Sequence, residues 1–244
     1  MGIRTELDRI KGAKAALKTA IEGKGVTVLG TTKLDGYAAL VDSIVDNGLK
    51  ITEFDVDMNP TKVEVLGDTI WRRAFASSAS GTYPWQLVTE ISAPNVTFVA
   101  YNGIINMSSL LHLYLPHVTT LSQSAIVGNH ALTNISLPEL LSAEQYAIYN
   151  NSNVETYYFP KCTTTSGLRP MGFATANTSL VSAQLGSIGY PVTALSVGTF
   201  YNATSASLVI TVYVTPGSQP LAGSPWNATN ATIVYRSAVD GSVL

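Results

Sequence analysis

The spacing of four prolines limits the fold of this chain more than any other feature. Pro94, Pro116, Pro138 and Pro160 stand 22 residues apart, with no insertion or deletion between them. Equal spacing over several units is typical of repeat proteins, in which each unit packs only against its neighbours. The sequence therefore predicts a solenoid of stacked coils.

An apolar frame of the form L-x-x-L-x-L precedes each of these prolines. The frames are Val88, Ile91 and Ala93; Leu110, Leu113 and Leu115; Leu132, Ile135 and Leu137; and Val154, Tyr157 and Phe159. Side chains alternate across a strand, and proline donates no hydrogen bond to a sheet. Each frame therefore predicts one short strand that ends at its proline and faces a common core.

Two other series recur with the same period. They are Val96, Val118, Leu140 and Cys162, two residues after the prolines, and Ile104, Ile126 and Ile148, ten residues after the first three. An asparagine also precedes several frames, at Asn106, Asn129, Asn151 and Asn177. We expect the first two series to point inward. Each asparagine stands three or four residues before a frame, where its side chain can bond the backbone of the turn into the strand.

The repeat weakens toward both ends of the chain. Leu180, Ala183 and Leu185 keep the frame with Gly186 in the proline position, and Val209, Val212 and Val214 keep it once more. Before the first full frame, Val63, Val65 and residues 70–75 predict a degenerate capping coil, because terminal repeats are usually atypical. After the last, Trp226 is expected to cover the final coil, followed by a closing strand through Thr232, Val234 and Tyr235.

These features predict an α plus β-solenoid fold with one short strand per coil of about 22 residues. Residues 1–50 form a helical attachment or oligomerisation module, and residues 51–87 a linker with the degenerate capping repeat. Residues 88–216 form the solenoid, and residues 217–244 a closing segment.

The N-terminal module has two interpretations. Ile3, Leu7, Ile10, Leu17 and Ile21 follow the spacing of a coiled-coil seam, which predicts a homo-oligomer with a trimer favoured, but Lys14 interrupts the seam. A second apolar stripe runs from Leu34 to Ile44. In the second interpretation, the first helix folds back on a second helix as a helical hairpin. The two interpretations are compatible if the hairpins associate.

Residues 7–45 resemble the short N-terminal module of tail-fibre, head-fibre and prophage structural proteins, through the runs ALKTAIEGKGVTV and LDGYAAL. The ending PWNATNATIVY is similar to the C-terminal ends of several phage structural proteins. These resemblances imply a virion protein whose N-terminal helices contact other virion proteins.

Units such as LTNISLPELLSAEQYAIYNNSN resemble BspA-like leucine-rich repeats, which occur in bacterial surface proteins and some phage proteins. The family's A-F pair is matched at Ala74-Phe75 and approximated at Ala125-Ile126 and Ala147-Ile148. The resemblance implies a curved stack used for binding, with no cofactor and no chemistry of its own.

Charge is scarce over most of the chain. Between Ala74 and Tyr235 the charged residues are Glu90, Glu139, Glu144, Glu155, Lys161 and Arg169, and the net charge of the whole chain is −2. A protein of this composition has no positive field to hold nucleic acid or an anionic membrane. The sequence also has no apolar run long enough to span a bilayer and no signal-peptide pattern, so we expect neither membrane insertion nor standard export.

The sequence favours a non-enzymatic protein without a metal. Glu144 and Glu155 lie in different segments, whereas a glycosidase needs two carboxyl groups within about 10 Å. A stacked ladder could bring His112 near Asn134, but it supplies no three-ligand metal site. The single cysteine, Cys162, occupies an inward position, which predicts a buried thiol that reacts slowly.

Aromatic side chains on a polar surface are the candidate binding residues. Tyr114 and Tyr158 stand between inward frame residues and should point outward, and Ser92 and Ser136 hold the same position in their coils. Tyrosine rings can cover the apolar faces of sugars, and the same tyrosines could instead contact a neighbouring subunit.

The resulting hypothesis is a virion-associated phage fibre or tail appendage that presents its repeat domain to a host-surface glycan. The alternatives are a capsid or tail decoration protein without a receptor, and a bacterial cell-surface leucine-rich-repeat adhesin, which the missing export signal disfavours.

Overall fold

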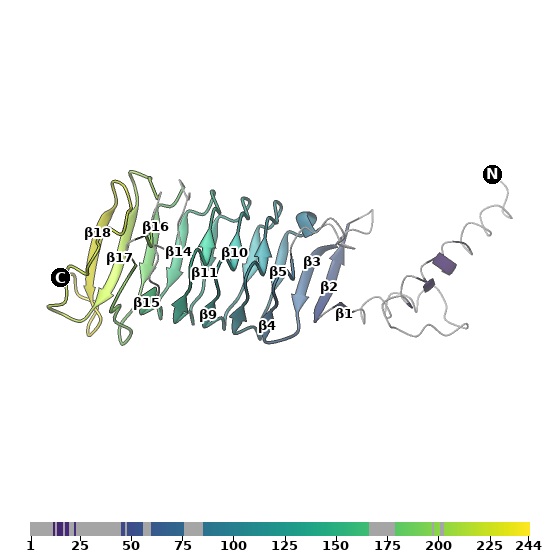
Figure 1. The fold of residues 1–244 in the computed structure, drawn as a ribbon, viewed down its shortest axis with the longest axis horizontal. Coiled ribbons are helices and arrows are strands. Elements are labelled where there is room, and N and C mark those ends of the chain that lie inside the picture. The colour runs from purple at the N-terminus through teal and green to yellow at the C-terminus, as the bar shows by residue number, and fades with distance from the viewer. Residues whose placement is uncertain are drawn as a thin grey trace.

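A computed structural model describes residues 12, 14–16, 18–19, 22, 45–46, 48–55, 60–75, 85–165, 179–196, 198–200 and 203–244. In this part of the chain the fold is an elongated β-solenoid whose coils lie side by side along the long axis (Figure 1). The predicted repeat architecture is confirmed. The predicted N-terminal seam residues Ile3, Leu7, Ile10, Leu17 and Ile21, and the second apolar stripe, lie outside the described residues.

The first face of the solenoid is built from the strands that end at or near the frame prolines, together with their counterparts in the terminal coils. They are β3 (Pro60–Val65), β5 (Glu90–Ser92), β8 (His112–Tyr114), β11 (Asn134–Ser136), β14 (Thr156–Phe159), β16 (Ser182–Leu185), β17 (Val209–Val214) and β18 (Thr232–Ser237). Neighbouring strands pair in parallel within each of two sheets, with His112 opposite Glu90 and Thr156 opposite Asn134. The 22-residue period is thus the register of β5 with β8 and of β11 with β14.

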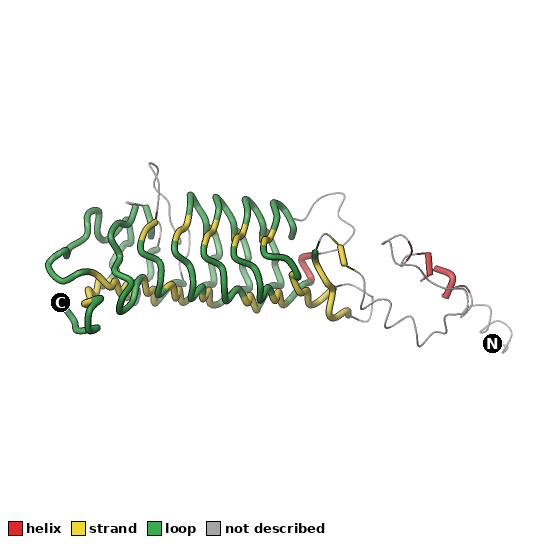
Figure 2. The backbone as a smooth tube through the Cα atoms, turned by 90° about the horizontal axis from the view of Figure 1, so that it is seen from below, coloured by secondary structure: helices red, strands yellow, loops and turns green. Residues whose placement is uncertain are grey.

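The expectation of one strand per coil was wrong, because regular coils carry up to three. The second face holds β4 (Thr69–Ile70), β6 (Phe98–Val99), β9 (Thr120–Leu121), β12 (Ser142–Ala143) and β15 (Thr164–Thr165), and the third holds β7 (Ile104–Ile105), β10 (Ile126–Val127) and β13 (Ile148–Tyr149). These strands have only two residues each, too short for an alternating pattern in the sequence to reveal them. Figure 2 shows the short strands separated by loops in successive coils.

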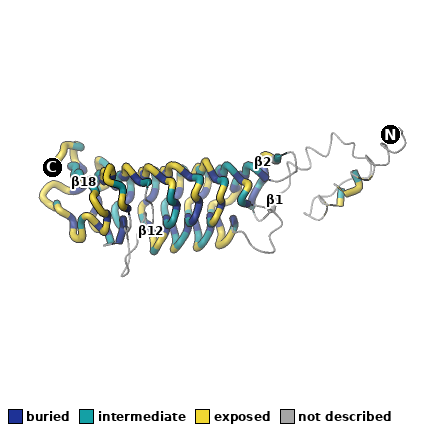
Figure 3. The backbone as a smooth tube through the Cα atoms, turned by 90° about the horizontal axis from the view of Figure 1, so that it is seen from above, coloured by how far each residue is buried: buried dark blue, intermediate teal, exposed yellow. Residues whose placement is uncertain are grey.

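The interior is a single apolar column that runs through all coils. The predicted inward positions are buried, including Val96, Ile104 and Cys162 with their counterparts in other coils. The residues of the four full frames are also buried, except Leu113, which is only partly buried. Buried and exposed residues alternate along the chain in every coil (Figure 3). Burial of this kind is the main stabilising term in a protein that has no disulfide among its described residues.

The frame predicted at Val209, Val212 and Val214 is correct at its last two residues and wrong at its first. Val209 is exposed and lies opposite Ser182, whereas Leu208 and Ile210 are buried. Val212 and Val214 point inward as predicted. Four β-branched residues in succession hide the alternation of β17, so the sequence does not show which of them face the core.

Antiparallel segments cover both ends of the parallel stack. At the N-terminal end β1 (Val45–Asp46) pairs with β2 (Leu49–Phe54), and β2 pairs with β3. At the C-terminal end Val243 forms an antiparallel bridge with Arg236 on β18, and the Ser237 N–H donates to the Ser242 carbonyl over 2.8 Å. Such coverage hides the edge of a sheet from other chains.

Helix is rare in the described part of the chain. It comprises the 3₁₀ turn η1 (Trp85–Leu87) and helical backbone at described positions between residues 12 and 22. No helix among the described residues is both long and apolar enough to cross a bilayer.

Candidate functional site

The four predicted ligand-facing residues occupy one outward column on the first face. Ser92 pairs with Tyr114 across β5 and β8, and Ser136 pairs with Tyr158 across β11 and β14. The side chains of Tyr114 and Tyr158 are 58% and 45% exposed, two coils apart. Their predicted outward orientation is confirmed, and we call this series, continued by Gln184 opposite Tyr158, the tyrosine column.

A second outward column runs beside it, two residues earlier in each strand. It consists of Glu90, His112, Asn134, Thr156 and Ser182. Alternation along a strand puts both columns on the same side of the sheet. The face thus combines aromatic rings with amide, imidazole and hydroxyl groups, and the period of the repeat predicts the equivalent positions of His112 and Asn134.

The hydrogen-bonded ladder of this face is interrupted between β8 and β11. The strands fall into two sheets, β1-β2-β3-β5-β8 and β11-β14-β16-β17-β18, whereas β9 pairs with β12 and β10 with β13 in the same coils. We call this interruption the ladder break. It lies between Tyr114 and Ser136, and it was not predictable because the frame residues on both sides are equally regular.

The polar side chains of β8 and β11 beside the ladder break, and that of Tyr158 on β14, have no hydrogen-bonding partner within the described residues. Tyr114, Tyr158, His112, Asn134 and Ser136 form no side-chain hydrogen bond or ion pair with any other residue of residues 85–165 or the other described segments. Their donors and acceptors therefore face solvent and are available to a ligand.

Several other polar side chains of the solenoid are engaged with the neighbouring coil. Glu144 accepts hydrogen bonds from the Ser122 hydroxyl and the Gln123 N–H at 3.1 and 3.0 Å. His130 contacts Ser152 at 3.0 Å. These groups join successive coils, which distinguishes them from the unengaged groups beside the ladder break.

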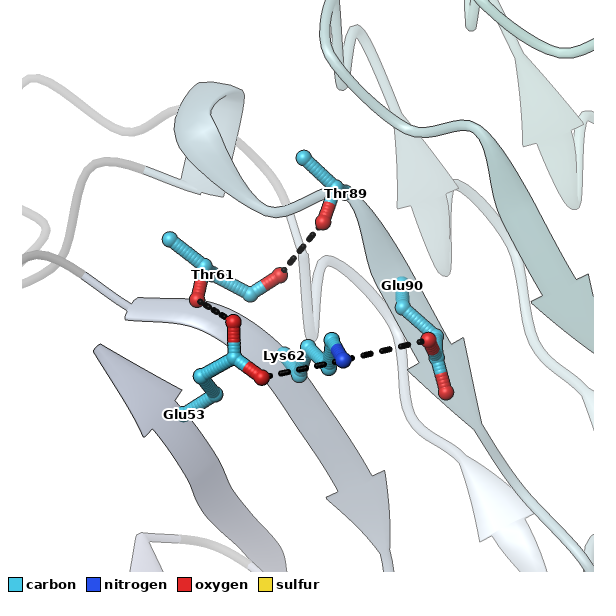
Figure 4. Close-up of polar contacts among 5 residues, drawn as sticks. All are labelled: Glu53, Thr61, Lys62, Thr89 and Glu90. Carbon is cyan, nitrogen blue, oxygen red and sulfur yellow. Dashed lines mark hydrogen bonds and ion pairs between the residues drawn. The ribbon is translucent and has the colours of Figure 1, made fainter. Parts of the chain in front are cut away.

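The charged groups at the N-terminal end of the first face pair with one another (Figure 4). Lys62 Nζ lies 2.9 Å from Glu53 and 3.9 Å from Glu90, and the Thr61 hydroxyl donates to Glu53. The hydrogen bond with Lys62 holds the pKa of Glu53 below its ordinary value, and the same bond raises the pKa of Lys62. The ammonium group is therefore committed to two carboxylates.

Two buried asparagines form a ladder inside the solenoid, next to the third face. Asn129 Oδ1 accepts from the Met107 N–H at 3.0 Å, and Asn151 Oδ1 accepts from the Asn129 N–H at 2.9 Å. Their Nδ2 atoms donate to the carbonyls of Ile104 and Ile126. The predicted backbone-bonding role is confirmed at these two positions.

The other members of the predicted asparagine series differ. Asn106 is exposed and has a φ of 56°, because its column is a left-handed turn position that Gly128 and Asn150 also occupy. Met107 holds the place equivalent to Asn129. Asn177 lies outside the described residues.

Cys162 and Trp226 are both packed into the interior. Burial raises the pKa of the Cys162 thiol to about 12, so the nucleophilic thiolate is scarce at neutral pH. Trp226 is fully buried beside Phe200, with ring centroids 6.3 Å apart, and its Nε1–H donates to the Ala222 carbonyl.

No cluster of three or more potential metal ligands occurs among the described residues.

Comparison of the chain with protein-family models, with curated proteins and with solved structures gives no match.

Proposed function

We propose that this chain is a non-enzymatic appendage protein of a bacteriophage virion, whose solenoid presents its first face to a glycan on the host surface. The observation that carries the binding role is the tyrosine column. Two exposed tyrosines with unengaged hydroxyl groups project from one face, and a core that continues through every coil supports them. A binding site on such a scaffold is held in one geometry before the ligand arrives, which reduces the entropy lost on binding.

The chemistry of the face favours a carbohydrate. A tyrosine ring covers the apolar C–H face of a sugar, and neighbouring amides and hydroxyls can bond the sugar's own hydroxyl groups. Tyr114 and Tyr158 supply the rings, and Asn134 and Ser136 supply the polar groups between them.

The virion role is supported by the resemblance of residues 7–45 to phage structural modules and by the scarcity of charge on the rest of the chain. In this proposal residues 1–50 attach the protein to other virion proteins and join its copies, with a trimer favoured. The solenoid needs no cofactor for such a role.

Glycan arrays and binding to host cells test the adhesive role. We expect the double variant Tyr114→Ala, Tyr158→Ala to lose at least about tenfold in affinity, because stacked rings contribute roughly 1 kcal/mol each and a tenfold change corresponds to about 1.4 kcal/mol. The matched control is Tyr101→Ala, Tyr146→Ala, which removes two tyrosines that are 37% and 36% exposed and lie away from the first face. Equal binding by the wild type and both variants would refute the proposed site.

A purely structural role is the second candidate, and the third face favours it. Its outward residues Ile105, Val127 and Tyr149 form a half-exposed apolar column, which a neighbouring protein could cover. A decoration protein of this kind would bind no glycan in the experiment above.

Self-association is tested by multi-angle light scattering of the full chain and of a deletion variant that lacks residues 1–44. The deletion keeps β1, β2 and β3, so the N-terminal end of the solenoid stays covered. We expect an oligomer for the full chain and a monomer for the variant. Two monomers would refute oligomerisation through the N-terminal residues, and two oligomers would place the contact on the solenoid.

A further inference from the structure

We propose that the ligand of the first face is an uncharged polysaccharide that lies along the solenoid axis, across the ladder break between β8 and β11. This inference rests on the proposed glycan-binding function and adds the chemical class and the orientation of the ligand. Three observations support it: the charges near the face, the unpaired backbone groups at the ladder break, and the arrangement of the two outward columns.

The charges near the face select against acidic glycans. Within the described residues 85–165 the only lysine or arginine is Lys161, whose Nζ lies 2.6 Å from Glu139 and 5.3 Å from the ring centroid of Tyr190. At the two ends of the face, Lys62 is held by Glu53 and Glu90, and Arg236 on β18 donates to the Gly241 carbonyl over 2.9 Å. A sulfate or uronate would give up its hydration without gaining a cationic partner.

The carboxylates add to this effect. Glu90 stands in the same column as His112, and the exposed Glu155 directly precedes Thr156 of that column. Both would repel an anionic chain, most strongly at low ionic strength. An uncharged chain meets neither the repulsion nor the loss of hydration.

The ladder break exposes backbone groups that are paired in the neighbouring coils. The Leu111 N–H donates to the Thr89 carbonyl over 2.9 Å, and the Glu155 N–H donates to the Thr133 carbonyl over 2.8 Å. Among the described residues, the equivalent bond from the Thr133 N–H to the Leu111 carbonyl is missing. Leu111 and Thr133 are both exposed, so a ligand hydroxyl can reach these groups.

The partial exposure of Leu113 supports this interpretation of the ladder break. Its counterparts Ile91 and Ile135 are buried, whereas Leu113 is only partly so. Leu113 packs against the core from its inward position, so its lower coverage marks the place where the ladder is broken.

The two outward columns run along the solenoid axis, and they set the direction in which the polysaccharide lies. Tyr114 and Tyr158 are separated by one coil that carries Ser136, while His112 and Asn134 flank them on one side. An extended polysaccharide parallel to the axis can stack on both rings and bond the side chains between them. A chain across the axis would meet only one ring.

Binding of the full-length protein to an array of neutral, sulfated and uronate-containing polysaccharides tests the ligand class. We expect Tyr114- and Tyr158-dependent binding to neutral members, unchanged between about 0.05 and 0.5 M salt because no ion pairs form. Tyrosine-dependent binding confined to acidic members, or binding that weakens steeply with salt, would overturn the inference and leave the adhesive function standing. Binding to no member would overturn both.

Substitution and hydrogen exchange test the orientation, with the strongest neutral array member as the probe. Asn134→Ala should weaken binding about fivefold, the effect of losing one hydrogen bond of roughly 1 kcal/mol. Asn95→Ala, on an exposed turn away from this column, should not. The probe should slow amide exchange at Thr133 and leave Glu155 unchanged. Unchanged exchange at Thr133, or equal losses from both substitutions, would overturn the placement across the ladder break.

Discussion

At the scale of single residues, the same amino acid has different roles in successive coils. Asn129 and Asn151 lie in the interior and bond backbone groups of the neighbouring coils, whereas Asn106 is exposed in a left-handed turn. Both roles suit asparagine, whose short amide side chain bonds nearby backbone and tolerates positive φ. Sequence spacing alone could not separate them, because the turn position and the ladder position are adjacent.

Replacing Asn129 should destabilise the solenoid more than replacing an exposed asparagine. Asn129→Leu leaves the Met107 N–H and the Ile104 carbonyl without the partner that each has now. Unsatisfied buried groups cost about 1–3 kcal/mol each, so we expect a loss of about 2–4 kcal/mol in urea unfolding. Asn95→Leu, at an exposed position, is the control. Equal midpoints for the two variants would contradict the ladder's role.

The Cys162 thiol should make stability fall at alkaline pH. Its pKa is about 12 in the folded protein, above the ordinary value of 9.0. The contribution of the neutral thiol is therefore complete below about pH 9 and is lost as pH rises from 9 toward 12, because the unfolded thiol ionises first. The Tm of Cys162→Val should decline less over this range than that of the wild type. Valine is suitable because Val96 and Val118 occupy the equivalent position. Parallel declines would exclude this cause.

At the scale of elements, the frame residues predicted the strands of the first face and their register, because proline marks the end of each strand and the frame repeats without gaps. The strands of the second and third faces were missed, since two-residue strands such as β9 and β10 have no periodicity of their own. Their inward residues, Leu121 and Ile126, are stabilised in extended form by pairing with the neighbouring coils. Only the stacked structure contains that information.

The candidate site was predictable in part for the same reason. Alternation within the frame places Tyr114 and Tyr158 outward, and the period aligns them with Ser92 and Ser136. The ladder break depends on the distance between two backbones, and no residue type marks it. The engagement of Lys62 by Glu53 was also hidden, because it depends on the antiparallel pairing of β2 with β3.

At the scale of the whole molecule, the covered ends of the stack should control aggregation. Deleting residues 242–244 removes the bonds from the Ser237 N–H to Ser242 and from the Leu244 N–H to Tyr235, and it leaves the outer edge of β18 without its bridge partner. Such an edge can pair with another chain. We expect the deletion variant to form large species in size-exclusion chromatography, whereas Val239→Ser, which keeps these bonds, should elute as the wild type does. Identical elution of both would show that the edge is protected in another way.

The constant register between neighbouring coils also bears on how the length of such a protein can change in evolution. Because β5, β8, β11 and β14 repeat at one interval and each coil meets only the coils beside it, a duplicated 22-residue unit can be inserted without altering the rest. Each inserted unit would lengthen the rod by about 4.8 Å, the spacing of neighbouring strands. The reach of the protein can thus be adjusted in small, uniform increments by gene duplication alone.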